Sequence, residues 1–290
     1  MPGKSTPLLK ASSFTSQTLD RFYPEDGADL PGVSMQLAKL QHIRFSPGCL
    51  SIWTGQNGHG KSLMLNQFAL DVIQSGEKVA IASFEMSAGR TLQRLVRQAT
   101  GQFKPEMDEV VRCLDWLGKS LWIYDHLGSV NHKNVLEAFS RGQDEHGISH
   151  MVIDSLLKCG LGEDDYSGQK RLVDDLQNFA QKRGAHVHLV THSRKLSSDQ
   201  DRPGKCDVRG SAGITDLSDI VLSVWRNREK EEARETHVPV KCPFDAILNV
   251  AKHRDMGGDA EGPYGLYYHA PSMQFGDAER MEPYIYWRPA

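Results

Sequence analysis

Long apolar runs are missing from this chain of 290 residues. No stretch approaches the roughly 18 uninterrupted apolar residues that a membrane-spanning helix requires, so we expect no membrane partner. An excess of one charge is also lacking, since 34 Lys and Arg stand against 37 Asp and Glu, for a formal net charge of −3. This balance excludes a globally basic nucleic-acid-binding protein, although a local basic surface could still bind phosphates.

Cysteine is scarce, and its spacing forms no recognisable pair. The five residues are odd in number and widely scattered, without a C-x-x-C pair: Cys49, Cys113, Cys159, Cys206 and Cys242. A disulfide framework and a structural zinc site are therefore not expected, and we predict reduced thiols in a cytoplasmic protein. His146 and His150 have H-x-x-x-H spacing but straddle a Gly-containing turn, so we predict no metal site there.

The first 30 residues show no sustained hydrophobic periodicity. We interpret residues 1–30 as a flexible arm or linker and residues 31–290 as one α/β domain. Residues 1–18 contain no acidic residue, which is a feature of mitochondrial transit peptides. With two lysines and no arginine in that stretch, a disordered arm is the favoured interpretation and a mitochondrial location the less favoured one.

From Cys49 onward, short apolar runs alternate with stretches at helical spacing. We predict strands at 49–55, 78–85, 120–125, 150–155, 185–193 and 219–226, helices at 61–76, after Ser87 and at 171–184, and a C-terminal β-hairpin from 246–253 and 264–269. This alternation indicates a mainly parallel twisted sheet with helices on both faces. Ligands of such sheets bind at the carboxyl ends of the strands.

Residues 55–62 match the phosphate-loop pattern G-x-x-x-x-G-K-[ST] in full, between a predicted strand and a predicted helix. Glycines allow backbone N–H groups to close around phosphate oxygens, and the helix N-terminus adds positive potential. Lys61 would contact the β- and γ-phosphates, and Ser62 would ligate Mg²⁺. The predicted binding residues for ATP or another nucleoside triphosphate are Gly55, Gln56, Asn57, Gly58, His59, Gly60, Lys61 and Ser62.

Three further strand ends carry polar residues that suit hydrolysis. Asp154 ends the apolar run 151–153, at a position where a carboxylate that organises Mg²⁺ through water is needed. The next residue, Ser155, is not an acid, so the base that activates the attacking water must come from elsewhere. Glu85 is the leading candidate, because it ends the strand that we expect beside the phosphate loop; a helix N-terminal charge is the structural alternative. His192 ends another strand, near the expected γ-phosphate, and a buried histidine without a catalytic role is its alternative.

Two groups of cations follow. Arg194, Lys195, Arg202, Lys205 and Arg209 make the segment after His192 basic, although three aspartates lower its net charge, so a solvated charged loop stays possible. Lys252 and Arg254 flank His253 at the end of a predicted strand. If they project outward to the triphosphate of a neighbouring subunit, they would act as fingers supplied in trans.

Together these motifs resemble the RecA-like core of replicative ring helicases: the DnaB type, the phage primase–helicases and the mitochondrial helicase Twinkle. The resemblance covers about residues 31–276. Ser83-Phe84-Glu85-Met86-Ser87 is similar to the family segment with the catalytic glutamate, and Met151-Val152-Ile153-Asp154 corresponds to its second magnesium motif. Thr191-His192-Ser193-Arg194-Lys195 resembles the phage and mitochondrial form of the γ-phosphate sensor, and Ala251-Lys252-His253-Arg254 occupies the finger position.

The resemblance implies a RecA-like P-loop NTPase core and an ATP-dependent DNA helicase of DNA replication that moves 5′→3′. It also implies a hexamer with single-stranded DNA in its channel, where the 194–209 segment touches DNA phosphates. His192 would be the sensor and Arg254 the finger. The His192 form favours a phage origin, and a separate primase or polymerase is an expected partner.

The sequence also departs from that family. It contains no primase domain and no zinc module, and about 30 residues precede the core. A stand-alone helicase core, an arm that docks on a neighbouring subunit and a fragment of a primase–helicase all stay open. So does a different class of function, a non-translocating RecA-type ATPase that acts as a recombination mediator or a regulatory nucleotide switch.

Overall fold

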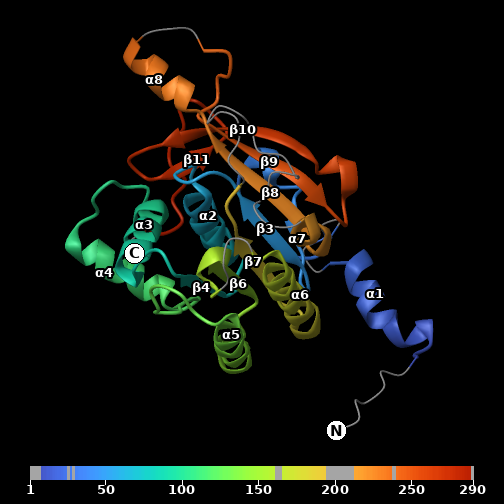
Figure 1. The fold of residues 1–290 in the computed structure, drawn as a ribbon. Coiled ribbons are helices and arrows are strands. Elements are labelled where there is room, and N and C mark those ends of the chain that lie inside the picture. The colour runs from blue at the N-terminus through green and yellow to red at the C-terminus, as the bar shows by residue number, and fades with distance from the viewer. Residues whose placement is uncertain are drawn as a thin grey trace.

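A nine-stranded sheet forms the centre of the computed structural model, which describes residues 8–24, 27, 30–160, 165–193, 212–236 and 240–288 (Figure 1). Its strands are β3 (Leu50–Thr54), β4 (Val79–Ser83), β5 (Leu121–Ile123), β6 (His150–Asp154), β7 (His186–Val190), β8 (Ile220–Arg226), β9 (Ala246–His253), β10 (Gly262–His269) and β11 (Gln274–Gly276). They lie in the order β11-β10-β9-β8-β3-β7-β6-β4-β5.

The sheet has a parallel part and an antiparallel part. From β5 to β8 every neighbouring pair is parallel, whereas β8, β9, β10 and β11 pair antiparallel. The predicted α/β class and the predicted hairpin of β9 and β10 are therefore confirmed, and β11 extends the hairpin by a third strand. A separate two-stranded sheet, β1 (Val33–Ser34) with β2 (Arg44–Phe45), precedes β3.

Helices cover both faces of the sheet. They are α2 (Lys61–Gln74), α3 (Ala88–Thr100), α4 (Met107–Leu117), α5 (His132–His146) and α6 (Tyr166–Arg183), with the shorter α1 (Thr15–Phe22), α7 (Ala212–Leu217) and α8 (Arg228–Thr236). Successive strand residues point to opposite faces, so Val79 and Ile81 pack with α2, α3 and α4, whereas Ala80 and Ala82 pack with α5 and α6.

One prediction about strand order is wrong. We expected the strand before Glu85 to lie beside the phosphate loop, but β7 and β6 stand between β3 and β4. The connection through α2 skips two strand positions, and strands from later in the chain fill them. Local hydrophobicity shows that β4 is a buried strand but carries no information about its neighbours in the sheet.

The N-terminal region contains a helix that the sequence pattern did not predict. No residue of α1 is buried, and Arg21 of this helix forms an ion pair of 2.9 Å with Asp255, beyond the end of β9. In the part of the chain that the structure describes, no helix combines the length and the apolar character needed to cross a bilayer.

Candidate nucleotide-binding and hydrolytic site

The glycine-rich turn after β3 has a backbone that requires glycine at two positions. Gly55 has a φ of 146°, and a Cβ at this residue would lie 2.4 Å from the carbonyl oxygen of Val224. Gly60 has a φ of 91°, and its Cβ would lie 3.1 Å from the ring of Phe275. Larger residues would strain both positions, so the glycines allow the turn to close against β8 and β11.

Lys61 begins α2 and points its ammonium group back into this turn. Its Nζ donates hydrogen bonds to the carbonyl oxygens of Gly55, at 2.8 Å, and Gln56, at 2.9 Å. Burial lowers the pKa of Lys61 to about 8, although the carboxylates of Asp154 and Glu85 oppose this shift. A buried cation enclosed by glycine-rich backbone at a helix N-terminus is well suited to bind a phosphate group.

Ser62 and Asp154 bring two oxygen donors together beside this lysine. The Ser62 hydroxyl donates a hydrogen bond of 2.6 Å to Oδ2 of Asp154, which ends β6. Burial raises the pKa of Asp154, and the hydrogen bond from Ser62 opposes that shift. Mg²⁺ prefers oxygen ligands and is held in such sites by one or two side chains together with substrate phosphates. The two side chains therefore fit this ion.

Glu85 lies after β4 and contacts residues from two other strand ends. The buried Ser155 hydroxyl donates a hydrogen bond of 3.0 Å to Oε1 of Glu85, and His192 Nε2 lies 3.6 Å from the same oxygen. The neighbouring His192 lowers the pKa of Glu85 to about 2, and the hydrogen bond from Ser155 acts in the same direction, although burial opposes both. The carboxylate is thus ionised at neutral pH, and 43% of the side chain is exposed.

Strand order explains how residues so far apart in the sequence meet. β3, β7, β6 and β4 are consecutive in the sheet, so the segments that follow or end these strands meet along one edge and bring together Lys61, Ser62, His192, Asp154 and Glu85. Several buried polar atoms along this edge have no hydrogen-bond partner among the described residues: Thr54 Oγ1, Ser83 Oγ, Thr191 Oγ1, His192 Nδ1 and Ser193 Oγ. Such atoms are expected where water or a ligand binds.

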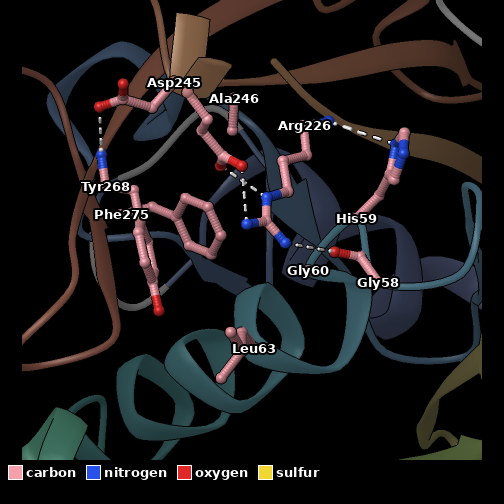
Figure 2. A pocket seen from close by; sticks show the side chains of 10 residues that line it. Gly58, His59, Gly60, Leu63, Arg226, Asp245, Ala246, Tyr268 and Phe275 are labelled. Atoms are coloured by element: carbon pink, nitrogen blue, oxygen red, sulfur yellow. Dashed lines mark hydrogen bonds and ion pairs between the residues drawn. The ribbon is translucent and has the colours of Figure 1, made fainter. Parts of the chain in front are cut away.

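A cavity of about 130 Å³ opens beside the phosphate loop, and sequence reasoning did not predict it (Figure 2). Its walls include the Tyr268 and Phe275 rings, with centroids 5.2 Å apart, and the side chain of Arg226. The Arg226 guanidinium pairs with both Glu231 oxygens, at 2.6 and 2.8 Å, and donates to the Gly58 carbonyl oxygen at 3.3 Å. Aromatic faces and a guanidinium are partners that a planar nucleobase can stack on.

A sequence signal existed for one of these residues. Arg226 is the last residue of β8, which neighbours β3, so the rule for carboxyl ends of parallel strands could have identified it. Tyr268 and Phe275 come from β10 and β11, and no motif marks them.

Lys252 and Arg254 lie at the opposite edge of the sheet. β9 runs antiparallel to β8, and His253 pairs with Ile220 at the start of β8. Lys252 Nζ donates to the carbonyl oxygens of Thr215, Asp216 and Ser218, at 2.8, 3.2 and 2.5 Å, around the C-terminus of α7. Arg254 Nη1 lies 2.7 Å from Asp219 Oδ1. Neither cation reaches the phosphate loop of its own chain, so a role in hydrolysis would require a neighbouring subunit.

The predicted DNA-contacting residues Arg194, Lys195, Arg202, Lys205 and Arg209 lie outside the described residues. The structure places only the ends of this segment. Ser193 follows β7, and α7 begins at Ala212. The segment therefore starts next to the candidate sensor His192 and ends at the helix that Lys252 contacts.

A family model described as an AAA domain matches residues 25–198, which is more than half of the chain. The chain belongs to the AAA domain family. A DNA helicase/primase of Enterobacteria phage T3 is 22% identical over 296 residues, which cover 89% of this AAA domain chain and 52% of that protein. The chain thus spans about half the length of this curated relative.

Two solved structures have the same fold as this AAA domain. The first, described as an ATPase domain, aligns with a TM-score of 0.78 and 17% identity, covering 94% of this chain and all (100%) of that one. A DnaB-like replicative helicase, solved in a study of its interactions with primase, aligns with a TM-score of 0.73 and 17% identity. The alignment covers 96% of this chain and 69% of that one. These likenesses confirm the predicted RecA-like fold.

Proposed function

We propose that this AAA domain is the motor of an ATP-dependent, replicative-type DNA helicase. Nucleoside triphosphate hydrolysis would drive its movement on single-stranded DNA, as a homo-oligomer that we expect to be a hexamer. One observation carries this proposal: Lys61, Ser62, Asp154, Glu85 and His192 lie along one edge of the sheet, where Ser62 is 2.6 Å from Asp154 and Glu85 is 3.6 Å from His192. The helicase names of the T3 relative and of the DnaB-like structure support it.

In the proposed mechanism, the loop backbone and Lys61 bind the phosphates of the nucleotide. Bound Mg²⁺, held by Ser62 and through water by Asp154, would neutralise charge that develops on the phosphate oxygens. The ionised Glu85 accepts a proton from the water whose oxygen attacks the γ-phosphorus. The nucleoside diphosphate leaves from the opposite side of the phosphorus. His192, 3.6 Å from Glu85, lies where it could respond to the presence of the γ-phosphate.

The cavity of Arg226, Tyr268 and Phe275 would hold the nucleobase, because it adjoins Gly58 and Gly60 of the phosphate loop. Burial of the base against two aromatic rings would add affinity without selecting strongly between purines. ATP is the preferred candidate, by resemblance to the relatives.

The remaining assignments concern neighbours in the ring. Arg254 and Lys252 would reach the triphosphate of an adjacent subunit, and Arg194, Lys195, Arg202, Lys205 and Arg209 would contact DNA phosphates.

We propose that residues 31–290 form the ATPase domain and residues 1–30 an arm or linker. We also propose 5′→3′ movement, a location in the cytoplasm of a bacterial or phage-infected cell, and a separate primase or polymerase as a partner.

Steady-state ATP hydrolysis with and without single-stranded DNA, at two salt concentrations, tests the proposal. Lys61→Ala removes the phosphate-binding cation, and Lys119→Ala, which changes an exposed lysine after α4, serves as the matched control. We expect DNA to stimulate hydrolysis, high salt to weaken the stimulation, and Lys61→Ala alone to abolish turnover.

Two other outcomes have definite meanings. Hydrolysis that needs Lys61 but ignores DNA would refute the helicase and favour the non-translocating RecA-type ATPase. Hydrolysis that survives in Lys61→Ala would refute the assignment of the site itself.

A further inference from the structure

The residue after Asp154 is a serine whose side chain is fully buried, with 0% of its surface exposed. Backbone hydrogen bonds to the preceding Asp154 and to Ser155 itself fix its position. Asp154 pairs with Ser83 between β6 and β4, and the Phe84 amide donates a hydrogen bond of 2.8 Å to the Asp154 carbonyl oxygen. On the other side, the Lys158 amide donates to the Ser155 carbonyl oxygen at 3.0 Å, where a short 3₁₀ turn begins.

Glu85, in contrast, stands in the short connection between β4 and α3, and 43% of its side chain is exposed. Its carboxylate is joined to the backbone through three rotatable side-chain bonds, so it needs a partner to hold one orientation. Within the described residues, Ser155 is the group that donates a hydrogen bond to it, at 3.0 Å, because His192 Nε2 is 3.6 Å away and beyond hydrogen-bond range.

Both contacts are made to the same carboxylate oxygen, Oε1. The second oxygen, Oε2, is thereby left for the proton of the attacking water. A hydrogen bond donated to a carboxylate also favours its ionised form, which a base requires.

We propose that Ser155 is a positioning residue, whose hydroxyl holds the Glu85 carboxylate in the orientation that accepts a proton from water. This inference rests on the proposed hydrolysis and on the role of Glu85 in it. It assigns a function to the position where an acid was absent: the proposed base follows the end of β4, and the donor that orients this base follows the end of β6.

Ser155→Ala tests the proposal in steady-state ATP hydrolysis. We expect kcat to fall about 10- to 100-fold, a part of the roughly 10²- to 10⁴-fold that a positioned base contributes, while KM and the affinity for a fluorescent ATP analogue stay unchanged. The acid limb of the pH–kcat profile should move to higher pH, since Glu85 loses a group that stabilises its charge. Ser155→Thr, which keeps the hydroxyl, should restore most of kcat.

The chain offers a matched control at the other end of β6. The Ser149 hydroxyl also donates a hydrogen bond to a glutamate, Glu77, on the side of the sheet away from the phosphate loop. Ser149→Ala removes a bond of the same chemistry and should leave kcat and the pH profile unchanged.

A double-variant cycle shows whether Ser155 acts through Glu85. On a Glu85→Gln background, Ser155→Ala should lower the residual rate by less than twofold. An equal loss on both backgrounds, or a wild-type kcat and pH profile in Ser155→Ala, overturns the proposal while hydrolysis by the wild type still stands. Absence of hydrolysis in the wild type overturns both proposals. Should Ser155→Ala not fold, Ser155→Cys decides, because a thiol is a weak donor and a wild-type kcat would refute the role.

Discussion

A buried carboxyl group in the helix of the phosphate loop should make the stability of this protein fall as the pH rises. Asp71 lies in α2 with 1% of its surface exposed. Oδ1 accepts a hydrogen bond of 2.7 Å from the Tyr286 hydroxyl, and Oδ2 accepts one of 3.2 Å from the Gln36 amide. Burial raises the pKa of Asp71 from 3.8 to about 7, although both hydrogen bonds oppose this shift.

The sign and the size of the effect follow from this pKa. The unfolded chain releases the proton of Asp71 near pH 3.8, whereas the folded protein keeps it until about pH 7. Between these values the folded state binds the additional proton, so the free energy of unfolding decreases with rising pH and levels off above about pH 7. Since one pKa unit corresponds to about 1.4 kcal/mol, the full loss is on the order of 4 kcal/mol.

Asp71→Asn removes this dependence, because its amide imitates the protonated acid. The amide oxygen can accept from the Gln36 amide, and the amide NH₂ can donate to the Tyr286 oxygen. We expect the variant to match the wild type near about pH 4 and to exceed its free energy of unfolding at about pH 8 by up to about 4 kcal/mol. Urea unfolding followed by circular dichroism at a series of pH values measures the difference.

The exposed Asp115 provides the control, since Asp115→Asn in α4 should shift the whole stability curve little and leave its slope unchanged. Parallel pH profiles for the wild type and Asp71→Asn would refute the argument, because they would show that Asp71 ionises in the folded protein as easily as in the unfolded chain.

Two further predictions concern hydrolysis. Glu85→Gln keeps the shape of the side chain but cannot take a proton, so it should bind ATP normally and lose about 10²- to 10⁴-fold in kcat; a loss of ATP affinity equal to the loss in kcat would contradict this role. Arg254→Ala should lose on the order of 10³-fold or more in kcat, and mixing it with Lys61→Ala should restore activity at interfaces where an intact phosphate loop meets an intact Arg254. Wild-type hydrolysis by Arg254→Ala alone would exclude the finger in trans.

The phosphate loop, its flanking strand and helix, and the strand ends at Asp154 and His192 were predictable because each is encoded locally. A glycine pattern, an apolar run and a following polar residue occupy a few consecutive positions. The order of β7, β6 and β4 was not predictable in this way, because it depends on how crossover helices pack against the whole sheet. The contact of Glu85 with Ser155, which follows from that order, could not be foreseen either.

Helices α4 and α5 were missed although their sequences carry start signals. Glu106 and Glu109 form a capping box at the start of α4, and Asn131 accepts a hydrogen bond from the Lys133 amide at the start of α5. The N-cap of α4 is a glutamate, in place of the preferred Ser, Thr, Asp or Asn. The N-cap of α5 is an asparagine, which follows a run of turn-forming residues. Each signal was weaker than the apolar periodicity on which the other helices were predicted.

The C-terminal strands show most clearly how the site depends on contacts between distant segments. Gln67 of α2 pairs with both backbone groups of Phe275, donating to its carbonyl oxygen at 2.9 Å and accepting from its amide at 2.7 Å. Gln98 of α3 donates a hydrogen bond of 2.8 Å to the carbonyl oxygen of Met273, two residues before Phe275. Because the ring of the same Phe275 touches Gly60 and lines the candidate base cavity, a nucleobase that displaces this ring would act on the phosphate loop and on α2 together. The third antiparallel strand is therefore part of the candidate nucleotide site, although no motif in its sequence indicates this role.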